Sequence, residues 1–112
     1  MKDRSTGQTG DRVLDEIVRR LVKAYAPERI YLFGSRARDD AGAESDYGLL
    51  VVVDDGAAPE RRSSRLAYEV LWGTEASADV IVWTSSRFER RKHVVCSLPA
   101  TVLREGRLIH AA

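Results

Sequence analysis

The stretch YLFGSRARDDAGAESDYGLLVVV, from Tyr31 to Val53, decides the fold of this chain. A short β-rich run ends at Gly34-Ser35, a polar loop follows, and a nearly continuous apolar run begins at Leu49. Runs that are apolar on both faces predict strands in the middle of a sheet that helices cover. We therefore expect two buried strands, joined by this loop, at the centre of the protein.

The flanking segments supply helices and a further strand. Apolar residues recur at helical spacing from Asp11 to Tyr25, and Pro27 ends that helix. The other expected elements are strands over 29–33 and 78–83, a helix over 59–72, a helix that begins after Thr84 or Ser85, and a short helix between Pro99 and Gly106. This order predicts an α/β or α+β fold with a small mixed central sheet flanked by helices.

Length and composition narrow the class of protein. With 112 residues, the chain is expected to hold a flexible tail over 1–10 and a single domain over 11–112. A net charge of +1 gives no general attraction to nucleic acid or to an anionic membrane. A single cysteine, Cys96, and the lack of a long apolar run favour a cytoplasmic protein that makes no membrane contact.

The Gly34-Ser35 pair directly follows the first strand. Glycine lets a backbone approach a ligand closely, and free N–H groups with a serine hydroxyl can hold a phosphate oxygen. Such pairs also mark ordinary turns, so the pair alone is weak support for a phosphate site. Arg36 and Arg38 lie beside it, where one of them would neutralise charge on a triphosphate.

Asp46 opens the second apolar run. Residues two apart in a strand project from the same face, so positions 46 and 48 would face one ligand about 6 to 7 Å apart. Two acids there would hold Mg²⁺ against a triphosphate, and Asp79, at the start of the next strand, is the candidate for a third. Position 48, however, is occupied by a glycine, Gly48, and not by an acid.

These motifs together resemble the minimal nucleotidyltransferase domain of the DNA polymerase β superfamily. The family pattern is Gly-Ser-x-Ala-x-Gly, then Ser-Asp-x-Asp-Leu, then a later Asp on an adjoining strand. The matching residues here are GSRAR at 34–38, SDYGLLVV at 45–52, and Asp79. The resemblance spans about Leu14 to Arg107 and implies a nucleotidyltransferase fold.

The resemblance implies a Mg²⁺-dependent enzyme with ATP as substrate. Asp46 and Asp79 would be its catalytic and metal-binding residues. The nucleotide-binding residues would be Gly34, Ser35, Arg36 and Arg38. Asp39 replaces the second glycine of the first motif, and Gly48 replaces an expected metal ligand. Loss of such a ligand is expected to slow transfer while nucleotide binding survives.

The resemblance also implies a partner. Stand-alone domains of this family are often paired with HEPN-domain toxins, and the antitoxin adenylylates a tyrosine of the toxin. The sequence therefore predicts an antitoxin-like protein adenylyltransferase, in a homo- or hetero-oligomer. The alternative is a catalytically inactive module that neutralises its partner by complex formation, which Gly48 supports. Nucleotidylation of a small molecule ranks third, because no separate acceptor domain is visible.

Other conspicuous residues receive structural interpretations. Trp72 and Trp83 are expected in the core, and Cys96 as a small buried apolar residue. The basic runs PERRSSR and RFERRKH are expected to be solvated helix faces.

Overall fold

The computed structural model describes residues 11–34, 47–74 and 78–112. In chain order the elements are α1 (Arg12–Tyr25), β1 (Arg29–Phe33), β2 (Tyr47–Val53), the 3₁₀ turn η2 (Pro59–Arg62), α2 (Arg65–Val70), β3 (Ala78–Thr84), α3 (Ser85–Arg91), α4 (Leu98–Glu105) and β4 (Arg107–Ala111). The sheet has the order β3-β2-β1-β4. Strand β1 is antiparallel to β2 and β4, and β2 is parallel to β3. The expected mixed α/β fold is confirmed.

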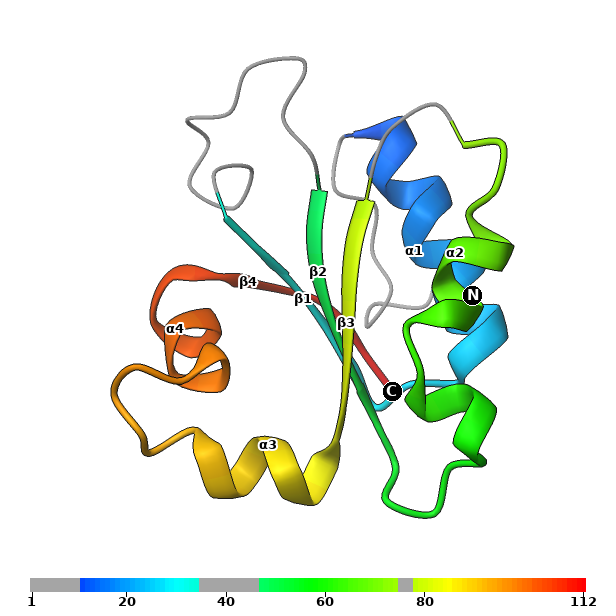
Figure 1. The fold of residues 1–112 in the computed structure, drawn as a ribbon. Coiled ribbons are helices and arrows are strands. Elements are labelled where there is room, and N and C mark those ends of the chain that lie inside the picture. Colours follow the sequence, from blue (N-terminus) through cyan, green and yellow to red (C-terminus); the bar gives the residue numbers. More distant parts are fainter. Residues whose placement is uncertain (1–10, 35–46, 75–77) are drawn as a thin grey trace.

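Helices cover both faces of this sheet (Figure 1). Helices α1 and α2 lie on one face and α3 and α4 on the other. Alternate residues of β2 pack against opposite layers, as the two-residue period of a strand requires: Leu49 and Val51 belong to the cluster beneath α1, whereas Leu50 and Val52 belong to the cluster that contains Phe88 of α3. The continuous apolar run of β2 therefore reflects burial on both sides.

Helix α1 begins and ends where its sequence predicts. The Asp11 carboxylate accepts hydrogen bonds from the backbone N–H groups of Val13 and Leu14, at 3.0 and 3.2 Å, and so caps the first turn. Ala26 follows the last turn in the left-handed conformation, with a φ of 46°, and Pro27 comes next. The buried stripe consists of Leu14, Ile17, Val18, Leu21 and Tyr25.

The helix expected over 59–72 is broken into η2 and α2. Ser63, between them, is extended, with φ −116° and ψ 141°. Its carbonyl accepts a hydrogen bond from the Tyr25 hydroxyl at 2.5 Å, and its hydroxyl accepts one from the Arg65 N–H at 3.1 Å. Serine side chains compete with helical hydrogen bonds in this way. The Ser63 carbonyl therefore bonds to Tyr25 of α1 rather than within a continuous helix.

Three further expectations were incomplete or wrong. The sequence reading missed β4, which gives β1 a second neighbour. Trp72 is 86% exposed rather than buried, on the turn that follows α2, and Cys96 is exposed as well. Within the described ranges, no helix combines the length and the apolar character needed to span a membrane.

Candidate functional site

Three strand ends meet at the edge of the sheet where the site is expected. Because β1 is antiparallel to β2 and β2 is parallel to β3, the end of β1 lies beside the starts of β2 and β3 (Figure 1). Phe33 pairs with Gly48, and Gly48 pairs with Asp79. The fold therefore places position 48 directly between the last residue of β1 and the second residue of β3.

This row of residues projects from the face that α3 and α4 cover. The next row on the same face, two residues along each strand, consists of Tyr31, Leu50 and Ile81. Those side chains pack in the cluster around Phe88. Because side chains alternate along a strand, Phe33, Gly48 and Asp79 point to the same side of the sheet.

Asp79 presents an exposed carboxylate at this edge. It makes no hydrogen bond or ion pair with any residue in the described part of the chain. Its backbone is fixed by the parallel ladder between β2 and β3, which runs from Tyr47 and Ala78 to Val53 and Thr84. A hydrated carboxylate on a rigid strand can accept a proton or contribute one oxygen ligand to a cation.

Gly34 ends β1 with a φ of +83°. A Cβ at this position would meet no atom within 4 Å, so space does not require glycine here. The positive φ does, because residues with a side chain rarely adopt it. The conformation of Gly34 turns the chain out of the sheet at the point where the predicted phosphate loop begins.

Phe33 fills the space beside Gly48. A Cβ built on Gly48 would lie 2.8 Å from Cε1 and 3.0 Å from Cδ1 of the Phe33 ring, closer than non-bonded carbons approach. The ring is partly buried against the cluster around Phe88. Position 48 therefore lacks a carboxylate, and an aromatic ring occupies the room that its side chain would need. Sequence reasoning missed Phe33, which the register of the β1–β2 pair alone brings to this position.

The structure describes two of the predicted site residues, Gly34 and Asp79. The other four lie outside the described residues: Ser35, Arg36, Arg38 and Asp46. The described part of the chain contains no cluster of three or more His, Cys, Asp or Glu side chains able to hold a metal ion. Since Gly48 offers no donor and Phe33 fills its surroundings, position 48 does not supply the carboxylate that the motif pattern places there.

Helix α3 is fixed to the same side of the sheet by charged groups. Asp55, which follows β2, accepts a hydrogen bond from the Ser86 backbone N–H at 2.8 Å. This hydrogen bond lowers the pKa of the Asp55 carboxyl below its ordinary value. The Arg29 guanidinium lies 4.8 Å from the centre of the Phe88 ring and 3.6 Å from the Glu89 carboxylate. These contacts hold α3 across the strands whose opposite ends form the site.

Residues 12–109 match the family model of the nucleotidyltransferase domain. The chain belongs to the nucleotidyltransferase domain family. No curated protein matches its sequence.

Three solved structures share the fold of this nucleotidyltransferase domain. A proposed nucleotidyltransferase from Sulfolobus solfataricus is 27% identical, with a TM-score of 0.52 over 70% of each chain. A toxin-antitoxin crystallised with AMP-PNP is 20% identical, with a TM-score of 0.57 over 87% of this chain and 73% of that chain. A mutant of the toxin-antitoxin MntA-HpeT is 19% identical, with a TM-score of 0.52 over the same shares. At 19 and 20% identity the likeness shows the fold alone.

Proposed function

We propose that this nucleotidyltransferase domain transfers AMP from ATP to a tyrosine hydroxyl of a HEPN-domain toxin and so acts as an antitoxin in the cytoplasm. The observation that carries the proposal is the register that sets Asp79 beside position 48 at the open end of the sheet, in a chain of this family. The toxin-antitoxin structures of the same fold support a toxin as the partner.

In the proposed reaction, the acceptor oxygen attacks the α-phosphorus of ATP. A bond forms between that oxygen and phosphorus, and the bond from phosphorus to the pyrophosphate oxygen breaks. Asp79 would receive the hydroxyl proton, since its carboxylate is exposed and makes no ion pair within the described residues. Ser35 and Arg36, which follow Gly34 in the sequence, would bind the triphosphate.

Divalent metal is the usual companion of nucleotidyltransfer, and it would supply charge neutralisation for the triphosphate when bound. Asp46 and Asp79 are the residues proposed to hold it, with Arg38 adding positive charge near the phosphates. Because Gly48 provides no ligand, we propose a single weak ion site and slow transfer. Substitution of residues that hydrogen-bond to the ligands of a metal site lowers activity about 10- to 100-fold, so loss of a ligand itself should lower activity by no less.

The direct test is incubation of the chain with α-labelled ATP, Mg²⁺ and the HEPN-domain protein encoded beside it. Label should appear on a tyrosine of that protein, and Asp79→Asn should remove at least nine-tenths of the rate. Because the Phe33 ring occupies the room beside position 48, a carboxylate is restored there with the double variant Phe33→Leu/Gly48→Asp, which should be at least tenfold faster than Phe33→Leu alone. Absence of label with both the parent chain and this double variant would defeat the enzyme proposal.

A catalytically inactive binding module is the second candidate. The observation that favours it is the Phe33 ring in the space beside Gly48, where the family carries an acid. This candidate predicts a complex with the toxin without ATP, unchanged by Asp46→Ala. Size-exclusion chromatography distinguishes the two, because a complex that forms only with ATP and Mg²⁺ would exclude the second candidate.

A further inference from the structure

Two aromatic side chains stand exposed on α2 and on the turn that follows it. Tyr68 is 56% exposed and Trp72 is 86% exposed. Together with Arg65 and Glu69 they line an open hollow of about 470 Å³. Tryptophan, tyrosine and arginine are the residues that most often dominate the binding energy of protein interfaces. Exposed aromatic groups around a hollow therefore point to an interaction surface.

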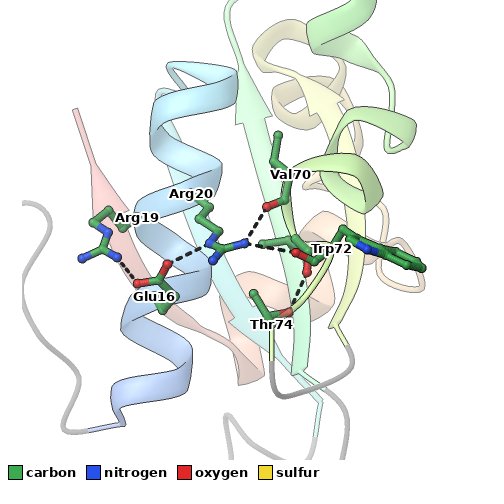
Figure 2. A network of polar contacts seen from close by, with 7 residues as sticks. Glu16, Arg19, Arg20, Val70, Trp72 and Thr74 are labelled. Atoms are coloured by element: carbon green, nitrogen blue, oxygen red, sulfur yellow. Dashed lines mark hydrogen bonds and ion pairs between the residues drawn. The ribbon is translucent and has the colours of Figure 1, made fainter.

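The backbone beneath Trp72 is held in place. Arg20 of α1 donates from Nη1 to the carbonyl oxygens of Val70 and Trp72, at 3.0 and 3.3 Å, and from Nε to Glu16 at 2.7 Å. Figure 2 shows the Trp72 indole pointing away from this network. An anchor on a fixed backbone loses less conformational entropy when it binds than one on a loose chain.

A second hollow, of about 500 Å³, adjoins the same turn. Its lining comes from α1 and the turn: Arg12, Val13, Glu16, Arg20, Gly73 and Thr74. The Glu16 carboxylate is engaged by Arg20 and Arg19, which lower its pKa. The exposed Arg12 and Arg65 guanidinium groups, in contrast, form no ion pair with any residue of the described ranges. The two hollows are thus bordered by positive charge that is free to pair.

We propose that this surface, formed by Arg12, Arg65, Tyr68 and Trp72, is the docking site for the protein partner of the chain. The partner would present an apolar side chain to Trp72, bordered by Asp or Glu side chains that pair with the two arginines. Nucleic acid fits less well, because the hollow beside Trp72 is lined by a single arginine and by Glu69 rather than by the continuous positive charge that a run of phosphates requires. The identity of the partner rests on the proposed function.

The surface lies close in sequence to the candidate site. Thr74 precedes β3 by a few residues, and Asp79 is the second residue of that strand. In Figure 1 the described residues that follow α2 extend toward the end of the sheet at which β3 begins. A partner docked on Trp72 would therefore lie at the end of the sheet that carries Asp79.

The test measures the affinity of the purified HEPN-domain protein by isothermal titration calorimetry without ATP. Trp72→Ala should weaken binding about 30-fold, as loss of an interface anchor does. The matched charge reversals are Arg65→Glu, expected to weaken binding about tenfold, and Glu69→Lys, expected to leave it unchanged or tighter. Leu103→Ala is the control, since Leu103 is 49% exposed on α4 at the other face of the sheet.

Several outcomes would overturn the docking site. The proposal is wrong if Trp72→Ala binds the HEPN-domain protein as tightly as the parent chain does, or if the parent chain forms no complex with it. It is also wrong if Trp72 instead mediates a homodimer of this chain, or binds a single-stranded oligonucleotide in place of the protein. Circular dichroism melting of each variant checks that it is folded. The labelling assay separates this proposal from the proposed function. If the complex depends on Trp72 but no variant transfers AMP, the enzyme proposal is wrong and the docking site is still supported.

Discussion

At the scale of single residues, the Phe33–Gly48 pair is the feature that distinguishes this site. Glycine inside a strand weakens it by roughly 0.5 to 1 kcal/mol relative to alanine, so local preference does not favour Gly48. Packing does, because a Cβ there would lie 2.8 Å from the Phe33 ring. Phe33 and Gly48 therefore pack as one unit across β1 and β2. We expect the effect on stability of a substitution at one to depend on the residue at the other.

A double-mutant cycle tests this unit. Gly48→Ala should fail to give the usual stabilisation of about 0.5 to 1 kcal/mol, since the ring must move to admit the methyl group. In a Phe33→Leu background the same substitution should become stabilising. Urea unfolding of the four proteins should give a coupling energy of at least about 0.5 kcal/mol. Additive effects would show that the ring moves without cost.

At the scale of elements, two helix ends depend on side chains from elsewhere in the chain. The carboxylate of Asp55, which follows β2, accepts a hydrogen bond from the Ser86 N–H of α3. Arg20, on α1, donates to the last carbonyls around the end of α2. These helices are seven and six residues long, too short to be stable alone. Their positions therefore depend on these contacts and on burial.

The Asp55 contact should give the stability of the protein a specific pH dependence. The pKa of Asp55 is lower in the folded protein than its ordinary value of 3.8, because the carboxylate accepts the Ser86 N–H. Its contribution is therefore complete above about pH 4 and is lost as the pH falls through the folded pKa. Asp55→Asn should lower the melting temperature at pH 6, and the difference should shrink toward pH 2. A difference that stays constant with pH would contradict this assignment.

Removal of the Arg20 side-chain charge should loosen the end of α2. Arg20→Met keeps the aliphatic stem but leaves the Val70 and Trp72 carbonyls without this donor, at a cost of about 1 to 2 kcal/mol in chemical unfolding. Arg19→Met is the matched control. Arg19 pairs only with Glu16 among the described residues and is largely exposed, so its loss should cost less than about 0.5 kcal/mol. Equal effects would show that general charge, rather than these carbonyl contacts, matters.

At the scale of the whole molecule, β4 completes the sheet. It pairs with β1 over Arg107–Ala111, with an irregularity opposite Ile30 and Tyr31. Its pairing places β1 between two antiparallel neighbours and covers an edge that would otherwise end the sheet beside the core. Ile109 contributes to the cluster beneath α1, whereas Leu108 is 53% exposed. The residue after Ile109, His110, is also buried, at 4% exposure, so the middle of the strand is covered while its first residues are exposed.

Two adjacent substitutions test that role. Ile109→Ala should cost about 2 to 4 kcal/mol of unfolding free energy, because it leaves a cavity against the core. Leu108→Ala removes a similar side chain from the surface and should cost less than about 0.5 kcal/mol. Thermal and urea unfolding give both values. If both variants were equally stable, β4 would not be part of the cooperative core.

The elements with strong local patterns could be predicted from the sequence alone. The helical spacing in α1, the β-rich run of β1, and the apolar runs of β2 and β3 are all local signals, and the structure confirms them within two residues. Motif order alone indicated the nucleotidyltransferase family, and it marked Asp79 and the missing acid at position 48. Ser35 and Asp46 stay predictions, since they lie outside the described residues.

The remaining features could not be predicted from local patterns, because they depend on contacts between residues far apart in the chain. The helix is interrupted at Ser63, whose carbonyl accepts a hydrogen bond from the Tyr25 hydroxyl. Strand β4 forms by pairing with the edge of β1 that β2 leaves open. Trp72 is exposed on the turn after α2, and Arg20 of another helix donates to its carbonyl oxygen. The Phe33 ring meets Gly48 through strand register, a property of two strands together that neither segment carries alone.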